Sequence, residues 1–360
     1  MLPPVGPSGG PREPMHIGTV DSFDSREPLS TVSTLGTNAG SEARVESIER
    51  LGFLPVAVDT ITASIALPFD LFVRTDPRVA PVLFRERQLA LEAGDFDRFG
   101  DQGISTLYIR VADHVAYRSF LLDTVLRDEG VSVGKRFRVL QVANRAVFQM
   151  AFSSRNADQL VGFAGEYGEE LARLVSDESV AACELLDLMA HDYYTYTHVT
   201  NVSVLVLLIA GRMGMGASDE IVALARGAVL HDIGKRHIAP VLLNQERPLT
   251  RRQREAIQEH AKLGFLELCH RRDVSWDQLM MVYQHHERCD GQGYPVGLVA
   301  DEIHPWARMC AVADVYDAMS SSRPYRPAIP LKEVWEVLEG DRGSQFDREV
   351  VKALRAVVSS

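Results

Sequence analysis

An adjacent histidine and aspartate follow an apolar helical stretch in the second half of the chain. Residues 224–235 read LARGAVLHDIGK, so His231 and Asp232 come directly after a run of apolar residues. Gly234 then lets the backbone turn sharply, and Lys235 returns a positive charge to the same place. An imidazole nitrogen and a carboxylate at the end of a buried helix are a suitable pair of metal ligands, because the carboxylate can bridge two ions. The pair alone does not identify a metal site, which needs further polar residues elsewhere in the chain.

Further candidate ligands lie on other predicted helices, each flanked by apolar residues. They are His198, His260, His285, His286 and Asp314. Taken singly, His198 or His260 is more often an ordinary core residue, and Asp314 is equally suited to a cap or an ion pair. Polar groups that face a core are costly unless they are hydrogen-bonded or metal-bound, so the whole set together indicates metal.

The chemistry of this set favours two transition-metal ions. Imidazole and carboxylate suit Fe, Mn, Ni, Co or Zn, and the lack of cysteine disfavours a purely structural zinc site. Seven ligands exceed what one ion with an open position needs, so we expect two ions that share Asp232. Ions about 3.5–4 Å apart can stabilise both the attacking and the leaving oxygen of a phosphoryl transfer, with a bound hydroxide as the nucleophile.

Capping patterns predict an all-α domain over residues 183–360. Two capping boxes, a first-turn proline and a final cap are visible at Thr250 with Gln253, Ser275 with Gln278, Pro305, and Asp347. No strand pattern of comparable strength appears in this part of the sequence. The candidate ligands therefore belong to a helical bundle.

The first half of the chain is organised differently, so we expect a multidomain protein. Residues 1–44 are rich in Pro, Gly, Ser and Thr and are predicted to be a disordered leader. Residues 45–117 contain strand-like stretches at 53–61, 67–75, 82–87 and 104–113 and a short helix at 95–100, which predicts a small α/β or α+β regulatory or interaction domain. Residues 118–182 are predicted to be a helical linker and a candidate dimer contact. We expect the glycines of this linker to break it into pieces: Gly130, Gly134, Gly162, Gly165 and Gly168.

Composition limits the location and the partners. The net charge of −11 over 360 residues argues against binding a nucleic-acid polymer, which needs a basic face. The four cysteines include no C-x-x-C pair, which is typical of a reducing compartment. The most apolar run, residues 202–210, has about half of the roughly 20 residues that span a bilayer. With no signal peptide visible at its start, the sequence predicts a soluble cytoplasmic protein without a membrane anchor.

Several motifs at their relative spacing resemble the HD-GYP domain family. They are HDIGK at 231–235, HHERCDGQGYP at 285–295, ADVYDAMSSSRPYR at 313–326 and QFD at 345–347, and YTYTHVTNVS at 194–203 is similar to the family's opening segment. The resemblance covers about half of the chain. It implies a helical bundle that holds two, sometimes three, Fe or Mn ions and hydrolyses cyclic di-GMP to linear pGpG and often to GMP. More loosely, residues 53–73 resemble segments found ahead of catalytic domains in cyclic-dinucleotide signalling proteins.

The resemblance also assigns roles to individual residues. The metal ligands fall on the seven candidates above, with Asp232 as the bridge, and Lys235 approaches a substrate phosphate and the metal-bound water. Arg323 and Arg326 match basic positions that meet phosphate or guanine, the alternative being charges at a helix C-terminus. Tyr294 is a candidate substrate contact in the loop at 290–295, where a purely structural role is equally open. Members with a third metal carry glutamate where this chain has Tyr194, so we expect a two-metal site.

We therefore expect a cyclic di-GMP phosphodiesterase whose N-terminal domain or GYP loop contacts signalling partners. Two alternatives stay open. One is the same chemistry on another cyclic dinucleotide, such as cyclic GMP–AMP, and the other is a non-catalytic receptor for a cyclic dinucleotide.

Overall fold

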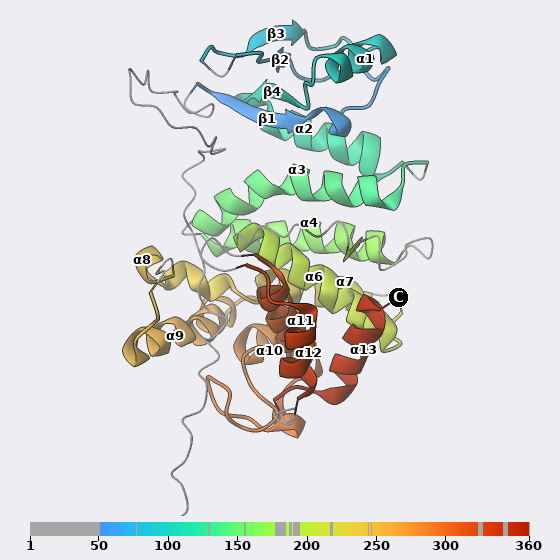
Figure 1. The fold of residues 1–360 in the computed structure, drawn as a ribbon. Helices are drawn as coiled ribbons and strands as arrows, with labels where there is room; N and C mark the ends of the chain where they lie inside the picture. The colour runs from blue at the N-terminus through green and yellow to red at the C-terminus, as the bar shows by residue number, and fades with distance from the viewer. Residues whose placement is uncertain are drawn as a thin grey trace, which may run out of the picture.

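The computed structural model describes residues 51–359 except 77, 129, 155, 177–184, 187–188, 190–194, 217–218, 244, 246, 323–326 and 341–344. The leader predicted for residues 1–44 lies outside the described residues. Three layers follow one another along the molecule: a small sheet at one end, the long helices α3 (Val133–Ser153) and α4 (Ala157–Val175) across the middle, and a helical bundle at the other end (Figure 1).

The sheet contains every strand that the sequence predicts. Its four strands are β1 (Phe53–Ala57), β2 (Leu71–Val73), β3 (Val82–Arg85) and β4 (Thr106–Arg110), in the order β1-β4-β2-β3. All three neighbouring pairs are antiparallel. The predicted short helix is α1 (Ala93–Asp101). The antiparallel pairing makes this part of the chain α+β and not α/β, since α/β units need parallel strands joined by crossovers. We call β1–β4 with α1 the sheet module.

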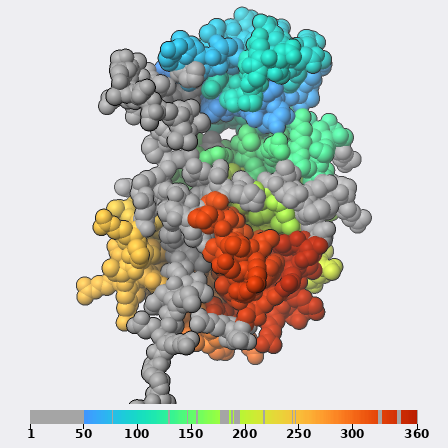
Figure 2. Space-filling view, viewed as in Figure 1, coloured from blue at the N-terminus to red at the C-terminus, as the bar shows by residue number. Residues whose placement is uncertain are grey.

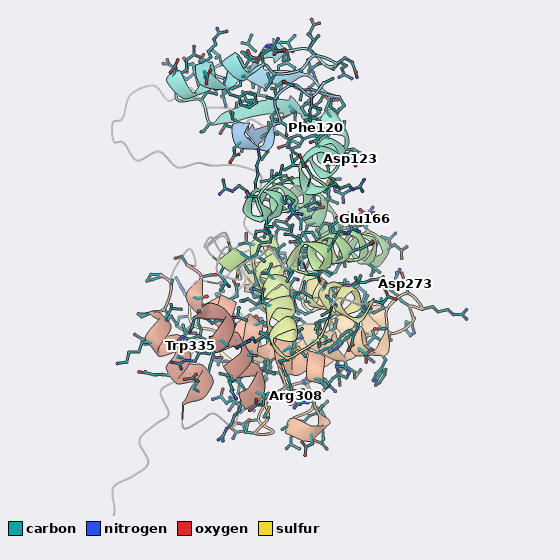
Figure 3. All side chains as sticks on the ribbon, turned by 90° about the vertical axis from the view of Figure 1, so that its right-hand side faces the viewer. Phe120, Asp123, Glu166, Asp273, Arg308 and Trp335 are labelled. Carbon is teal, nitrogen blue, oxygen red and sulfur yellow. The ribbon has the colours of Figure 1, made fainter. Side chains whose placement is uncertain are left out.

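One face of the sheet packs against α2 (His114–Leu121). Leu107 and Ile109 are buried and alternate with less buried positions on β4, and they belong to an apolar core that also contains Tyr117 and Phe120 of α2. Phe120 meets the ring of Phe69 edge-on at 5.6 Å (Figure 3). This period-2 alternation fixes which face of each strand is buried.

The helices that follow are longer than the glycine pattern predicts. After a π-helical turn (Leu122–Leu126), α3 and α4 run without interruption, and only Gly130 lies in a break between helices. Gly134 lies in the first turn of α3, and α4 contains Gly162, Gly165 and Gly168. The prediction that these four glycines interrupt the helices is wrong. Gly168 allows α4 to approach another helix closely, because an added Cβ would lie 3.0 Å from the backbone nitrogen of Arg226.

The second half of the chain is helical, as predicted. Its helices are α6 (Thr195–Arg212), α7 (Asp219–Leu230), α8 (Pro240–Leu243), α9 (Arg251–Leu268), α10 (Trp276–Gln284), α11 (Pro305–Ser320), α12 (Leu331–Glu339) and α13 (Arg348–Val358), with 3₁₀ turns at Ile233–His237 and Ala300–Glu302. Two further 3₁₀ turns, at Val58–Thr60 and Val111–Asp113, follow β1 and β4 in the first half. We call α6–α13 the helical bundle. Almost every residue of α6 is buried, so α6 is its central helix.

The predicted helix starts are confirmed. Reciprocal capping boxes begin α9 and α10, Pro305 occupies the first turn of α11, and Asp347 accepts backbone N–H groups at the start of α13. These caps satisfy donors that a helix start leaves unpaired. One difference concerns α10, which ends at Gln284, so His285 is its C-cap and His286 lies just beyond.

The core of the bundle extends beyond the predicted domain start at residue 183. One continuous apolar cluster runs from Leu126 to Leu354 and includes residues of α3 and α4. In a space-filling view the sheet module and the C-terminal helices form separate surfaces at opposite ends (Figure 2). Within the described residues, we find no helix long and apolar enough to cross a bilayer. The boundaries 1–44, 45–117, 118–182 and 183–360 stay a prediction.

Candidate metal centre

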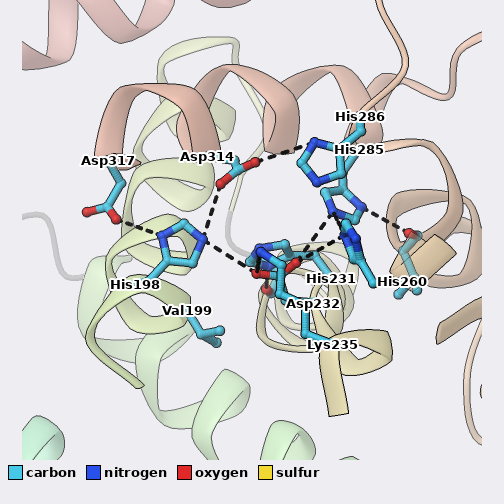
Figure 4. A network of polar contacts seen from close by, with 12 residues as sticks. His198, Val199, His231, Asp232, Lys235, His260, His285, His286, Asp314 and Asp317 are labelled. Atoms are coloured by element: carbon cyan, nitrogen blue, oxygen red, sulfur yellow. Dashed lines mark hydrogen bonds and ion pairs between the residues drawn. The ribbon is translucent and has the colours of Figure 1, made fainter. Parts of the chain in front are cut away.

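The seven candidate ligands converge in the middle of the helical bundle (Figure 4). His198 lies on α6, His231 and Asp232 directly follow α7, His260 lies on α9, and the remaining three come from the end of α10 and from α11. His286 is partly buried and the other six are buried. Residues far apart in the sequence therefore form one polar cluster inside an apolar core.

The carboxylate of Asp232 lies at the centre of the cluster. Its Oδ2 is 3.2 Å from Nε2 of His231 and 3.6 Å from Nε2 of His198. Its Oδ1 is 3.4 Å from Nε2 of His260 and 3.7 Å from Nε2 of His285. Each oxygen thus faces two imidazole nitrogens on its own side.

Two donor groups share this carboxylate. The first consists of His198, His231 and Asp232; the second consists of Asp232, His260, His285 and His286. Within each group the ligand atoms lie within 4.8 Å of one another. Asp314 is the second carboxylate between the groups, with Oδ1 3.1 Å from Nε2 of His198 and Oδ2 3.8 Å from Nδ1 of His286.

Backbone carbonyls fix the tautomers of three of the histidines. In each case Nδ1 lies within hydrogen-bond distance of the carbonyl oxygen three residues earlier: His231 to Ala228 at 2.7 Å, His260 to Ile257 at 2.8 Å, and His285 to Val282 at 2.9 Å. A carbonyl oxygen only accepts, so Nδ1 carries the hydrogen. In the neutral ring, Nε2 then presents a lone pair to the centre of the cluster.

The centre therefore gathers acceptors that need a cation. Nε2 of His260 lies 3.3 Å from Nε2 of His285, and both face Oδ1 of Asp232, which is buried without a hydrogen-bond partner among the described residues. Facing lone pairs repel unless a proton or a metal ion lies between them. Burial, helped by the nearby Lys235 ammonium, lowers the pKa of His260 to about 3, which disfavours a proton at neutral pH. The cluster is thus suited to metal, and its nitrogen and oxygen donors suit first-row transition ions.

Lys235 keeps the central carboxylate charged. Burial alone would raise the pKa of Asp232, but the Lys235 ammonium, the largest opposing influence, helps to hold it well below the usual range. The ammonium donates to Oδ2 of Asp232 at 2.8 Å and is only 2% exposed. The positive charge predicted at this place therefore lies inside the cluster. Burial also raises the pKa of Asp314, and the neighbouring His198 and His286 together lower it by more.

Gly234 lets the segment that carries Asp232 lie close to α9, which the sequence did not predict. The prediction was a sharp turn, but the residues after Asp232 form a 3₁₀ helix, and Gly234 is not among the glycines with positive φ. An added Cβ at Gly234 would overlap the carbonyl oxygen of His260, and one at Gly264 would lie 3.1 Å from the Gly234 nitrogen. The two glycines let the 3₁₀ helix lie directly on α9, which brings Asp232 to His260.

The loop after the paired histidines is held by a residue that the sequence reasoning also missed. Glu287 is buried, and its carboxylate accepts backbone N–H groups from Val296 at 2.7 Å, Gly297 at 3.0 Å and Leu298 at 2.9 Å. The available signal was a glutamate directly after two ligands. Three hydrogen bonds to one carboxylate close the loop back onto the metal centre.

Two glycines of this loop are needed for different reasons. Gly291 has a positive φ of +74°, whereas Gly293 is required by space, because a Cβ there would overlap the backbone of Glu287 and Arg288. The ring of Tyr294 stacks on His286 at 4.7 Å and is followed by a cis peptide bond to Pro295. Tyr294 thus packs against a candidate ligand, and its substrate contact stays a prediction.

Asp317 is a further buried polar residue that the sequence reasoning did not single out. It lies one turn after Asp314 on α11, and its Oδ2 is 2.7 Å from Nδ1 of His198. The spacing of three residues between two aspartates on one predicted helix was the available signal. The predicted substrate-binding residues Arg323 and Arg326, and Tyr194 at the position linked to a third metal, lie outside the described residues.

Comparisons with known proteins agree with this fold. Residues 173–350 match the family model of the HD domain. A cyclic di-GMP phosphodiesterase of Pseudomonas aeruginosa is 34% identical over 59% of this chain and 51% of its own length. A cyclic di-GMP phosphodiesterase response regulator of Xanthomonas campestris is 31% identical over 74% of this chain and 63% of its own length. A 3′3′-cGAMP-specific phosphodiesterase of Vibrio cholerae is 33% identical over 46% of this chain and 36% of its own length.

A solved structure gives the same fold. The protein Bd1817 of Bdellovibrio bacteriovorus, described as an HDG"Y"P protein, superposes with a TM-score of 0.62 over 86% of this chain and all of its own, at 18% identity. The C-terminal half of this chain therefore belongs to the HD domain family. Its HDIGK and HHERCDGQGYP motifs resemble those of the HD-GYP group. The chain spans only about one third to two thirds of the length of the three relatives named above.

Proposed function

We propose that this chain is a metal-dependent phosphodiesterase that hydrolyses cyclic di-GMP to linear pGpG. The supporting observation is that two groups of imidazole donors meet on the two oxygens of one carboxylate, Asp232. Shared carboxylates of this kind are used in two-metal phosphoryl transfer. The names of two of the relatives support the substrate.

The seven clustered residues would hold two divalent ions, with iron or manganese as the proposed pair. His198 and His231 would serve one ion, His260, His285 and His286 the other, and Asp232 both, with Asp314 between the groups. When bound, the two ions supply Lewis acidity, which lowers the pKa of water and neutralises charge on the phosphate.

The remaining residues would orient the substrate and balance charge. Lys235 places a buried ammonium 2.8 Å from Asp232, beside the position where negative charge develops on the phosphate as the 3′-oxygen leaves. Asp232 and Lys235 are therefore the proposed catalytic residues. Arg323 and Arg326 are proposed to meet phosphate or guanine, for which a planar guanidinium is well suited, and Tyr294 to border the substrate from the loop.

The other proposed properties follow from the sequence. We propose a cytoplasmic location, regulation through the sheet module or the loop at 290–297, and self-association as a homodimer. A second substrate is supported by the relative that is named for 3′3′-cGAMP. In the receptor alternative, the same pocket binds the cyclic dinucleotide without cleaving it.

Metal content and turnover on one sample test the proposal. The chain is purified anaerobically, loaded with Fe(II) or Mn(II), and incubated separately with cyclic di-GMP and 3′3′-cGAMP, with products separated by chromatography. We expect about two metals per chain and conversion of cyclic di-GMP to pGpG. Asp232→Asn should lose metal and lower turnover by at least about 1,000-fold, which corresponds to roughly 4 kcal/mol of barrier.

The other possible outcomes distinguish the alternative substrate and the receptor from the proposed enzyme. Faster cleavage of 3′3′-cGAMP would replace the substrate, and binding of either nucleotide without cleavage at full metal load would favour the receptor. Failure of the wild-type chain to bind metal would contradict the proposal, because every role above depends on it.

A further inference from the structure

His198 is held between two carboxylates on successive turns of α11 (Figure 4). Its Nε2 lies 3.1 Å from Oδ1 of Asp314, on the side of the metal centre. Its Nδ1 lies 2.7 Å from Oδ2 of Asp317, on the opposite side. A carboxylate is only an acceptor, so Nδ1, at the shorter of the two contacts, carries a hydrogen. Nε2, on the side of the candidate metal centre, is then the nitrogen that would present its lone pair to a bound ion.

Asp317 is itself fixed by further hydrogen bonds. Its Oδ1 accepts from Nδ2 of Asn201 at 2.7 Å and from the hydroxyl of Ser321 at 3.2 Å, and the residue is 1% exposed. Asn201 lies one turn after His198 on α6, just as Asp317 lies one turn after Asp314 on α11. Two facing helices thus each contribute a residue pair spaced three apart, and the outer pair supports the inner one.

The other histidines have a different kind of support. His231, His260 and His285 each place Nδ1 against a neutral backbone carbonyl of their own helix. Only His198, among these four, has a charged group behind the ring, supplied by a residue 119 positions away. A carboxylate behind an imidazole fixes its tautomer and raises the basicity of the ligating nitrogen.

We propose that Asp317 is a positioning residue that makes the two metal positions unequal: the position formed by His198, His231 and Asp232 depends on Asp317, and the position formed by His260, His285 and His286 does not. This inference rests on the proposed two-metal site, and it concerns metal binding, which is measured without any nucleotide.

The variant Asp317→Asn tests the tautomer directly. The side-chain amide has nearly the shape of the carboxylate but carries one acceptor and one donor. Asn201 already donates toward Oδ1, so the new amide group is driven toward Nδ1 of His198. His198 would then accept at Nδ1 and carry its hydrogen on Nε2, which removes it as a ligand.

Exchanging the residues at positions 201 and 317 should restore the original tautomer of His198. In the double variant Asp317→Asn with Asn201→Asp, the new carboxylate at position 201 accepts the amide N–H of position 317. The amide oxygen then faces Nδ1 of His198, and the original tautomer returns. A purely structural role for the Asp317 charge would not be repaired by moving that charge to another helix.

The experiment is a titration of the metal-free, full-length chain with Mn(II), followed by calorimetry and metal analysis. We expect two ions on the wild-type chain. For Asp317→Asn we expect one ion of unchanged affinity and one weakened by about 10- to 100-fold. The double variant should recover most of the second affinity, and the exposed control Asp301→Asn should match the wild type.

Three results overturn the inference. They are two ions at wild-type affinity in Asp317→Asn, equal weakening of both ions together with a lower unfolding temperature of the metal-free variant, and no recovery in the double variant. A wild-type chain that binds two ions but cleaves no cyclic dinucleotide would contradict the proposed function while the titration still decides the role of Asp317.

Discussion

The interiors of the sheet module and of the helical bundle treat polar groups in opposite ways. The core of the sheet module and α2 is apolar, and its buried Thr60 hydroxyl donates to the carbonyl of Ala57 at 2.6 Å and meets the Tyr117 hydroxyl at 2.8 Å. The centre of the bundle instead places buried imidazole nitrogens against the carboxylate of Asp232. In the first core, the Thr60 and Tyr117 hydroxyls are hydrogen-bonded to each other or to the backbone. The second leaves acceptors facing one another, which marks a site that an ion completes.

The largest effect that would break this contrast is expected from Gly234→Ala, which replaces none of the candidate ligands. The added methyl group overlaps the carbonyl oxygen of His260, so the 3₁₀ helix must move away from α9 and separate Asp232 from His260. We expect loss of bound metal and a drop in hydrolysis of about 100-fold, as displacements near 1 Å produce. Gly211→Ala on α6 is the matched control, because its Cβ meets no atom within 4 Å. Normal metal content in Gly234→Ala would show that the two segments can separate without harm.

Phe99→Ala should destabilise the sheet module and leave metal binding by the helical bundle unchanged. Phe99 is 1% exposed and contacts the rings of Phe84 and Phe96. Truncation should cost about 3–5 kcal/mol of unfolding free energy in the sheet module, measured by denaturant titration. Metal content should stay at the wild-type value below the unfolding transition. Loss of metal at the same denaturant concentration would mean that the two interiors unfold as one unit.

Two glycines of α4 should respond with opposite signs. Gly168→Ala presses a methyl group against the backbone of α7 at Arg226 and should destabilise the chain by about 1–3 kcal/mol. At Gly162 an added Cβ meets no atom within 4 Å, so Gly162→Ala should stabilise by about 0.5–1 kcal/mol through helix propensity. Thermal unfolding of both variants measures the difference. Equal shifts of the same sign would contradict the close approach of α4 and α7.

The smallest destabilisation is expected from Tyr117→Phe. Burial raises the pKa of Tyr117 to about 12, so its hydroxyl stays protonated and neutral over the ordinary pH range. Removing it leaves the Thr60 hydroxyl its bond to Ala57, so we expect a loss of only about 1 kcal/mol. A double-mutant cycle with Thr60→Val isolates the pair. A coupling near zero would show that the hydroxyl contact adds nothing to the sheet module.

Local patterns in the sequence predicted most of the fold. Period-2 alternation located the four strands, and capping boxes at Thr250 and Ser275 located two helix starts, because these signals lie within a few residues. The candidate ligands were also predicted, since a histidine in an apolar helix stands out. The structure brings them together, and their roles as ligands stay a proposal.

Contacts between distant segments were not predictable from local pattern. The pairing of Asp317 with His198 joins residues 119 positions apart. From the sequence, Gly168 was expected to break a helix and Gly234 to allow a sharp turn. Both are instead sites of close packing, because the need for glycine arises from other helices. Arg323 and Arg326 stay predictions.

The continuous core has a consequence for how the chain can be divided. Residues of α3 and α4 share one apolar cluster with α6 and α7, so the bundle's interior is completed by helices that precede its ligands. A fragment beginning at residue 183 would expose the apolar face that α4 covers. A fragment that keeps this interior covered should therefore begin near Ser132, the N-cap of α3, and it would uncover Val139 and Ala143 of α3, which belong to the core of the sheet module and α2. Domain exchange with related enzymes would have to carry these two helices along with the bundle and replace the sheet module ahead of them.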